Sequence, residues 1–302
     1  MAETSSLQQR LQRVIRQDVQ STHGYAIQPS AGLIKLDAME NPFRLPLPLQ
    51  RELGERLSHV AINRYPVQST ADVVAALSRH VELPTGCKLM LGNGSDELID
   101  MLSVACNVAG ASILAPEPGF VMYRMSAQLR GLRFIGVPLT AEFELDRNAM
   151  HAAIERERPA LTYIAYPNNP TCNLWDDAVI DEVEKVRPPY NISVLNAEAT
   201  LFALDHADEY ARQATVLRGE RERLQAAFRA MPGVRAYPSE ANMILVRVPD
   251  AQRAFDGMKA RGVLVKNIGA ALGHPLLANC LRLTVGAPEE NTQMIDALKA
   301  SL

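Results

Sequence analysis

The stretch Tyr166-Pro167-Asn168-Asn169-Pro170-Thr171-Cys172 follows directly on the apolar run Leu161-Thr162-Tyr163-Ile164-Ala165. The apolar run has the length and composition of a buried strand. The two prolines fix the backbone angle on either side of the paired asparagines. The sequence therefore predicts a strand that ends in a stiff polar turn. Open α/β sheets bind ligands at the carboxyl ends of their strands, so this turn is a candidate binding site.

Strand and helix patterns alternate on the N-terminal side of this turn, after a helical pattern over 5–20. The sequence predicts strands over 33–36, 88–91, 111–115, 133–137 and 161–166, and helices over 49–60, 71–80, 98–106, 121–129 and 148–156. Short links between the alternating elements favour a largely parallel sheet with flanking helices. We therefore expect an α/β fold for this part of the chain.

The C-terminal third has a different pattern. A long helix is expected over 198–231, with Leu217, Leu224 and Phe228 on its packed face, and the run Arg218–Arg223 is predicted to be a solvated face. Strands are expected over 234–237, 243–248, 263–268 and 280–285, and helices over 252–261 and 289–298. We predict an N-terminal arm and small-domain segment over 1–44, a large domain over 45–190, and a smaller α+β domain over 191–302.

Composition excludes several classes of function. The 302 residues are 47% hydrophobic and carry a net charge of −3, which gives no electrostatic basis for binding nucleic acid or an anionic membrane. No apolar stretch approaches the roughly 20 residues of a membrane span, and no secretory leader is expected. The four cysteines and six histidines are scattered, which predicts reduced thiols, a cytoplasmic location and no metal site.

The segment Gly92-Asn93-Gly94-Ser95-Asp96-Glu97 joins a predicted strand to a predicted helix. Glycines let the backbone approach an anion closely, and the N–H groups of the first helical turn can bind it. A phosphate group would suit this place. The alternative is an ordinary helix start that Ser95 or Asp96 caps.

Three further residues are candidates for ligand binding, each with an ordinary structural alternative. Phe120 lies in a strand-to-helix loop, where its ring either stacks on a flat heterocycle or packs in the core. Tyr65 follows Arg64 in a loop that either binds phosphate or is a surface turn. Arg282 alternates with Leu281 and Leu283, so it lies opposite the packed face, where it either binds a carboxylate or phosphate or faces solvent.

As a set, these segments resemble the histidinol-phosphate aminotransferases, which use pyridoxal phosphate and have the aspartate aminotransferase fold. The matching segments occur in the family's order and are Lys35–Pro42, Asn63–Pro66, Gly92–Glu97, Pro118–Tyr123, Tyr166–Thr171, Lys185–Asn191 and Leu281–Gly286. The resemblance implies an enzyme of histidine biosynthesis that transfers an amino group between histidinol phosphate and 2-oxoglutarate. It also implies a homodimer.

The resemblance also implies a role for each matching residue. Asn169 would bind the cofactor's ring hydroxyl, Phe120 would stack on the pyridine ring, and Gly94, Ser95 and Asp96 would hold the phosphate. Tyr65 would reach the phosphate in the neighbouring subunit. Arg282 would bind the acidic group of the substrate, and Asn41 would lie near the substrate.

One part of the family's pattern is missing. After the asparagine turn the family has a strand ending in an aspartate that pairs with the pyridine nitrogen, and later the lysine that carries the cofactor. Here only residues 170–184 separate Asn169 from Lys185, whereas one strand–helix–strand crossover takes roughly 30 residues or more. The missing stretch is therefore one to two such units, roughly 50 residues.

Two residues could replace the missing groups. Asp181 could serve as the nitrogen partner, but Asp176 and Asp177 form a good helix start and place it on a helix instead. Lys185 matches a different family segment from the one that holds the cofactor lysine, so the catalytic lysine is not identified. Cys172 stands where the family has glycine, which indicates relaxed constraint, or a tolerated change if φ is negative there. A catalytically dead descendant that keeps only cofactor binding or dimerisation is the alternative function.

Overall fold

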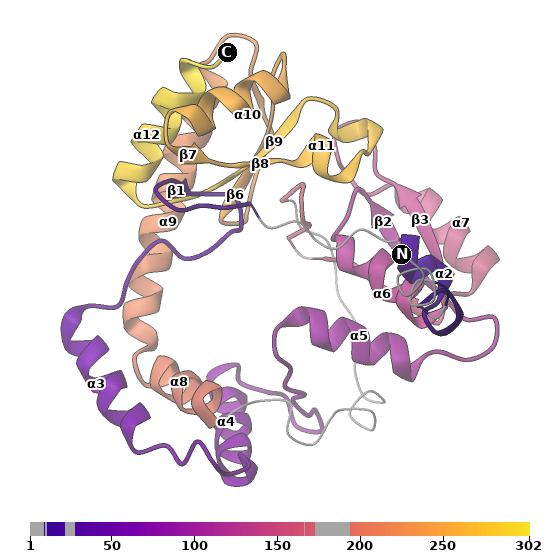
Figure 1. Ribbon diagram of the computed structural model, residues 1–302, viewed down its shortest axis with the longest axis vertical. Helices are drawn as coiled ribbons and strands as arrows, with labels where there is room; N and C mark the ends of the chain where they lie inside the picture. The colour runs from indigo at the N-terminus through magenta and orange to yellow at the C-terminus, as the bar shows by residue number, and fades with distance from the viewer. Residues whose placement is uncertain (1–8, 10, 22–27, 166, 173–193) are drawn as a thin grey trace. The chain divides into compact units, whose positions relative to one another are not determined.

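The computed structural model describes residues 9, 11–21, 28–165, 167–172 and 194–302 (Figure 1). The chain divides into two units, Met1–Gly32 and Leu33–Leu302. In the described part of the first unit, residues 11–14 are helical and α2 spans Gln17–Ser21, within the helix expected over 5–20. All other elements belong to the second unit.

A parallel sheet in the order β3-β2-β4 follows from the predicted strand–helix alternation. Its strands are β2 (Ser112–Glu117), β3 (Arg133–Pro138) and β4 (Leu161–Thr162), and β2 pairs in parallel with both neighbours. Helix α5 (Ser95–Ala105) precedes β2, α6 (Val121–Arg130) connects β2 to β3, and α7 (Arg147–Glu157) connects β3 to β4. The predicted α/β class is confirmed.

Alternating side chains of β2 build a core on both faces of this sheet. Leu114 packs with Met150 and Ala153 of α7, while Ile113 packs with Ala127 of α6 and with Leu132. Both β2 residues are fully buried. A strand buried on two faces needs apolar residues at successive positions, which explains the continuous apolar run in its sequence.

Two expected strands differ from the structure. Residues 88–91 are not in a strand, and β4 ends at Thr162 although its apolar run continues. A strand forms only where a neighbour accepts its backbone hydrogen bonds. Within the described residues no strand pairs with 88–91, and nothing lies beyond β4 in the sheet. The apolar sequence therefore favours a strand at both places, but the described residues supply no neighbouring strand to pair with it.

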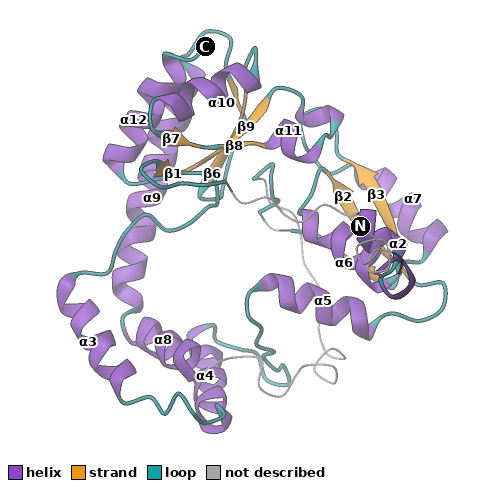
Figure 2. Cartoon of the chain, viewed as in Figure 1, coloured by secondary structure: helices purple, strands orange, loops and turns teal. Residues whose placement is uncertain are grey.

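The C-terminal part is built on an antiparallel sheet in the order β5-β6-β9-β8. Figure 2 labels three of these strands, β6, β8 and β9. Its strands are β5 (Arg235–Ala236), β6 (Met243–Arg247), β8 (Lys266–Asn267) and β9 (Cys280–Thr284). A second, parallel pair joins β1 (Ile34–Lys35) to β7 (Val263–Leu264). The smaller α+β region expected here therefore includes a strand from the beginning of the chain.

Helices cover the C-terminal sheet. They are α9 (Ala207–Arg229), α10 (Ala251–Ala260) and α12 (Pro288–Lys299), with α11 (Ile268–Leu272) and the 3-10 helix η2 (Pro275–Leu277) in the β8–β9 connection. Leu224 and Phe228 of α9 are fully buried in the core with Leu217 packed against them, as the predicted stripe requires.

The single long helix expected over 198–231 is two helices. α8 (Val194–Asp205) ends before His206, and α9 begins at Ala207. α8 packs against α3 (Leu47–Ser58) and α4 (Val67–His80). The His206 imidazole is 3.0 Å from the Glu52 carboxylate of α3, so the break between α8 and α9 coincides with a side-chain contact to another helix.

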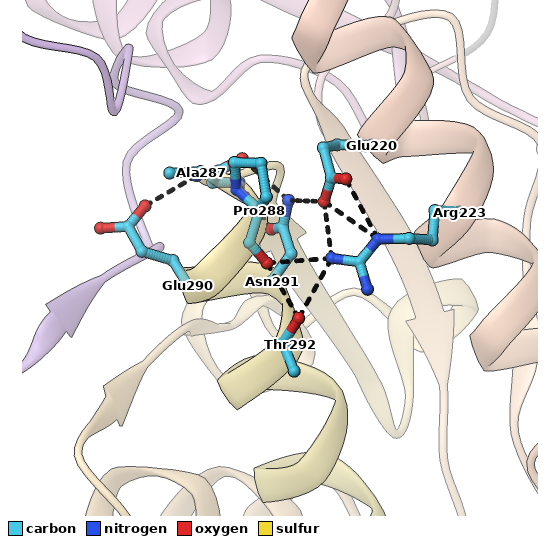
Figure 3. A network of polar contacts seen from close by, with 8 residues as sticks. Glu220, Arg223, Ala287, Pro288, Glu290, Asn291 and Thr292 are labelled. Atoms are coloured by element: carbon cyan, nitrogen blue, oxygen red, sulfur yellow. Dashed lines mark hydrogen bonds and ion pairs between the residues drawn. The ribbon is translucent and has the colours of Figure 1, made fainter.

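A polar network fixes the start of α12 against α9 (Figure 3). The Asn291 amide accepts from Gly286 N at 2.8 Å and donates to Glu220 Oε2 at 2.8 Å. Arg223 donates to Glu220 Oε2 at 2.7 Å and to Pro288 O at 3.0 Å. The prediction of a solvated face over Arg218–Arg223 is therefore wrong for Glu220, whose side chain is 14% exposed, and for Arg221, whose side chain is 12% exposed, whereas Arg223 is exposed as expected.

Candidate active site

The asparagine turn is closed by its own side chains. Asn168, only 1% exposed, donates from Nδ2 to Thr171 Oγ1 at 2.7 Å and to Pro118 O at 3.2 Å. The backbone N–H of Cys172 donates to Asn168 O at 2.6 Å. The bond to Pro118 ties the turn to the loop that follows β2 and carries Phe120. The predicted stiff turn at a strand end is therefore present, and it contacts the neighbouring loop.

Cys172 has a φ of +74°, in the left-handed region. The alternative of a negative φ is therefore wrong, and relaxed constraint is the explanation that remains. Glycine is the residue that this conformation favours. The side chain is fully buried, and burial raises the pKa of the Cys172 thiol to about 12. The thiol therefore stays protonated at neutral pH and is not a nucleophile.

Arg282 reaches from β9 to the asparagine turn. The arginine is 6% exposed, so the solvent-facing alternative is wrong. Its Nη1 donates to Asn169 Oδ1 at 3.0 Å, and its Nη2 donates to Asp37 O at 2.8 Å. Two residues predicted separately, one for the substrate and one for the cofactor, are thus in direct contact.

Asn41 lies on a segment that runs beside β9. Thr284 N donates to Leu36 O at 3.1 Å, and Met39 N donates to Thr284 Oγ1 at 3.1 Å. Asn41 itself donates from Nδ2 to Gln213 Oε1 at 2.8 Å. These bonds hold the segment that carries Asn41 next to the strand that carries Arg282, as a shared substrate site requires.

The Gly92–Glu97 segment forms an uncapped helix start. The N-cap of α5 is Gly94, with φ +83° and no side-chain capping bond, so neither Ser95 nor Asp96 is the cap. No atom lies within 4 Å of the position that a Cβ would take at Gly94, and Ser95 is exposed. N–H groups of a first helical turn that have no intrahelical partner bind anions readily.

Phe120 stands at the N-terminus of α6 and is half-buried. Its ring is 5.7 Å from the Tyr123 ring in an edge-to-face arrangement, and Tyr123 stacks on Tyr163 at 4.5 Å. Phe120 also lines a pocket of about 220 Å³ together with Arg124, Phe134 and His274. The residues that line this pocket do not include Asn169 or Ser95, so stacking of Phe120 on a ring held by Asn169 stays a prediction.

The remaining predicted residues lie apart from the Arg282–Asn169 contact. Tyr65 is 74% exposed and lines a second pocket, of about 580 Å³, with Arg56, His59 and Glu198 among others. No hydrogen bond or ring contact between described residues joins Ser95 to Asn169. Asp181 and Lys185 lie outside the described residues.

Three contributors to the site were missed by sequence reasoning. They are the Asp37 carbonyl, the Gln213 side chain and Lys266, which is paired with Arg282 across the β8–β9 ladder. Gln213 could have been found, because it occupies a polar position in line with Leu217 and Leu224 on α9 and is 2% exposed. Asp37 and Lys266 depend on pairing between distant strands, for which the local sequence carries no signal.

Two absences hold for the part of the chain that the structure describes. It contains no helix long and apolar enough to cross a membrane. It also has no group of three histidine, cysteine, aspartate or glutamate side chains placed to hold a metal ion.

Comparisons with known proteins place this arrangement in a family. The family model for aminotransferase class I and II matches residues 31–178 and 172–298. The histidinol-phosphate aminotransferase of Methylibium petroleiphilum is 58% identical, over 97% of this chain and 96% of that protein. The chain belongs to the histidinol-phosphate aminotransferases. The histidinol-phosphate aminotransferase of Polaromonas naphthalenivorans is 50% identical to this chain over the full length of both proteins.

Solved structures of histidinol-phosphate aminotransferases have the same fold. The enzyme from Sinorhizobium meliloti, solved in complex with pyridoxal-5'-phosphate, superposes with a TM-score of 0.75 at 18% identity, covering 95% of this chain and 96% of that one. The enzyme from Clostridium acetobutylicum gives a TM-score of 0.74 at 16% identity, covering 87% and 97%. The expected fold family is thereby confirmed.

The comparisons also bear on the internal gap. The alignment with the Methylibium histidinol-phosphate aminotransferase runs over 357 residues, whereas this chain has 302. That relative therefore has residues inside the matched range that this chain lacks. The family model matches in two parts that meet at 172–178, directly after the asparagine turn. The missing internal segment that the sequence predicted is confirmed at this place.

Proposed function

We propose that the chain binds pyridoxal phosphate and transfers an amino group between histidinol phosphate and 2-oxoglutarate, as an enzyme of histidine biosynthesis. The Arg282–Asn169 hydrogen bond is the observation that carries the proposal. It joins a cation suited to an acidic substrate to an amide at the carboxyl end of a parallel strand. The names of the relatives supply the substrate.

The residues present fit the cofactor. The Asn169 amide oxygen is turned toward Arg282, which leaves its Nδ2 to donate to an oxygen on the cofactor ring. The start of α5 at Gly94, with Ser95 and Asp96 after it, suits a phosphate group because no side chain caps it and the space beside Gly94 is empty. When bound, pyridoxal phosphate supplies an aldehyde that condenses with amines and a ring that accepts electrons.

The chain's own residues would bind and orient the reactants. Arg282 presents a planar pair of donors that suits a carboxylate, and its position is fixed by the Asp37 carbonyl. Asn41 lies beside the same strand and would contact the substrate. Phe120, on the loop to which Asn168 is bonded, would cover the cofactor ring.

Cofactor binding is tested by titrating the full chain with pyridoxal phosphate and following absorbance and tryptophan fluorescence. Asn169→Ala and Ser95→Ala should each weaken binding, since each removes a polar partner of the cofactor. Ser58→Ala, at an exposed serine of α3, is the matched control and should bind as the unchanged chain does. Intact mass should first show a value near 33.2 kDa, which verifies the chain under test.

Amino transfer is tested by mixing histidinol phosphate with the cofactor-loaded chain and measuring glutamate after 2-oxoglutarate is added. Formation of glutamate supports the proposal. Cofactor binding without glutamate would favour the binding-only alternative, and failure to bind pyridoxal phosphate would overturn the proposed function.

We also propose a cytoplasmic homodimer in which Tyr65 reaches the cofactor phosphate of the partner. Support comes from the exposed loop before α4, where Ile62 is 73% and Tyr65 is 74% exposed. Exposed large apolar residues on one loop are typical of an interaction site. Sedimentation of the full chain should show a dimer, and Ile62→Glu should shift it toward monomer.

The domain boundaries are proposed on the same basis. Pairing of β1 with β7 and burial of Leu36 in the C-terminal core support assigning 1–44 and 191–302 to the small domain. The large domain would then be 45–190, lacking one to two strand–helix units. Limited proteolysis of the full chain should cut near these boundaries.

A further inference from the structure

Gln213 is a buried polar residue of α9 that bonds the segment carrying Asn41. Gln213 is only 2% exposed, whereas Asn41 is exposed. Gln213 Oε1 accepts from Asn41 Nδ2 at 2.8 Å, and Gln213 Nε2 donates to Glu209 Oε1 at 2.9 Å. A buried amide that is bonded at both ends cannot turn over without leaving polar atoms unsatisfied. Gln213 therefore holds the exposed Asn41 amide in one position.

Glu209 decides which end of the Gln213 amide faces Asn41. Arg212 donates to both oxygens of the Glu209 carboxylate, at 2.9 Å and 2.7 Å, and these bonds above all lower the pKa of Glu209 to about 2. An ionised carboxylate only accepts hydrogen bonds, so Gln213 must turn its NH2 group toward Glu209. The Gln213 oxygen then faces Asn41, and Asn41 must turn its own NH2 group toward Gln213.

This orientation of the Asn41 amide has a consequence for ligands. Phe43 N donates to Asn41 Oδ1 at 3.0 Å, and one of the two Nδ2 hydrogens of Asn41 is donated to Gln213. Neither bond uses the second Nδ2 hydrogen, so Asn41 can donate it to a ligand. The same segment accepts from Arg282 through the Asp37 carbonyl at 2.8 Å. A phosphate or carboxylate oxygen is the acceptor that suits a donor beside an arginine.

We propose that Gln213 is a positioning residue that, with Glu209 behind it, makes Asn41 a hydrogen-bond donor to the acidic group of the substrate. This inference rests on the proposed function, in which Arg282 binds that acidic group. Histidinol phosphate carries it as a phosphate and 2-oxoglutarate as a carboxylate, and both present oxygen acceptors. Gln213 itself touches neither substrate, so its effect on binding passes through Asn41.

The test is a double-substitution cycle on the full chain, followed by calorimetric titration. Pyridoxine 5'-phosphate is present throughout, because it has no aldehyde that could react with an amine. The two ligands are histidinol phosphate and histidinol, which lacks the phosphate. Gln213→Leu should weaken histidinol phosphate binding about 5-fold and leave histidinol binding unchanged, since one hydrogen bond to the phosphate is affected. Asn41→Ala should weaken it at least as much. The double variant should bind no more weakly than Asn41→Ala alone, because Gln213 acts through Asn41.

Two further variants separate positioning from stability. Gln225→Leu removes a half-buried glutamine of the same helix, which donates to Ser239 O at 3.3 Å, and should bind both ligands as the unchanged chain does. Glu209→Gln keeps the size of the side chain but lets it donate as well as accept, so the Gln213 amide is no longer fixed. It should weaken histidinol phosphate binding about 2-fold, a part of the effect of losing the hydrogen bond. If Gln213→Leu does not fold, this variant carries the test, and unchanged binding to it overturns the inference.

The outcomes distinguish this inference from the proposed function. Equal weakening by Gln213→Leu and Gln225→Leu, equal weakening for both ligands, or additive losses in the double variant would overturn the inference while the proposed function stands. If the unchanged chain does not bind histidinol phosphate at all, the proposed function fails and the inference fails with it.

Discussion

The two sheets of this chain differ in how complete they are. In the antiparallel sheet, β6 and β9 pair over five positions and all of their residues except Arg247 are buried. In the parallel sheet, β4 pairs over two positions, with Leu161 half-buried and Thr162 exposed. The family match is interrupted just after β4. The comparison shows that the missing internal segment affects the parallel sheet and leaves the antiparallel sheet complete.

The contrast has a physical cause. The antiparallel sheet is covered by helices that come after the interruption. The segment around β1 is attached to it by backbone bonds to β7 and β9, and Leu139 and Phe143 pack against its other residues. The parallel sheet depends on neighbours supplied by crossover connections, and such a connection is what the chain lacks. A deletion therefore removes strands from one sheet while the other keeps every partner it needs.

Restoring the segment should have the largest effect on function. We expect that inserting the corresponding segment of the Methylibium relative between residues 172 and 178 raises turnover at least about 100-fold, because a positioned acid–base group contributes that much or more. Glutamate formation is the measurement. A glycine–serine insertion of equal length is the control and should leave turnover unchanged. Equal turnover with and without the native segment would contradict the view that the parallel sheet is incomplete.

Core substitutions in the two sheets should lower the free energy of unfolding by different amounts. Leu245→Ala in β6 removes a fully buried side chain and should lower the free energy of unfolding by about 2–5 kcal/mol. Leu161→Ala in β4 removes a half-buried side chain and should cost about 1 kcal/mol. Urea unfolding followed by circular dichroism measures both. Similar losses at the two positions would show that β4 is as well packed as β6.

The network at the start of α12 should make the antiparallel region sensitive to acid. Hydrogen bonding to Arg223, and secondarily to Asn291, lowers the pKa of Glu220 below 4.5 in the folded chain. A carboxylate with a lowered folded-state pKa stabilises the fold above its unfolded pKa, and this contribution is lost as the pH falls below about 4.5. Glu220→Gln should flatten that part of the stability profile. Glu222→Gln, at an exposed neighbour, is the control and should leave it unchanged.

The smallest expected effect is at the edge of the interruption. Cys172 has a positive φ, and glycine avoids the steric cost of that conformation. The Cys172→Gly variant should therefore be more stable than the Cys172→Ala variant by about 1 kcal/mol, measured by thermal unfolding. Both variants lack the thiol, so the effect of losing it cancels when their stabilities are compared. A Cys172→Ala variant of equal or greater stability would show that φ there is negative in solution.

Local pattern was sufficient for much of the fold. The apolar run at 133–137 lies within β3, the helical pattern at 148–156 lies within α7, and alternation around Arg282 correctly gave the packed positions Leu281 and Leu283. These features depend on residues within one element. The asparagine turn was also recognisable, because proline and asparagine restrict the backbone on their own.

Features that depend on distant partners were not predictable. Residues 88–91 have a strand sequence but no strand pairs with them in the described chain. The position of Lys266 opposite Arg282 follows from a strand register that the β8–β9 connection sets. For the candidate site, the residue types could be chosen from sequence, whereas the contacts between Arg282, Asn169 and Asp37 required the tertiary structure.

The short β4 has a practical consequence for anyone who handles this protein. In the described chain its outer backbone groups face no further strand, and an open strand edge is a template on which other chains assemble. The rate of aggregation should therefore increase with protein concentration, without any change in the structure of the antiparallel region. Light scattering during storage would reveal it, and dilute, freshly prepared samples are the ones on which ligand titrations should be performed.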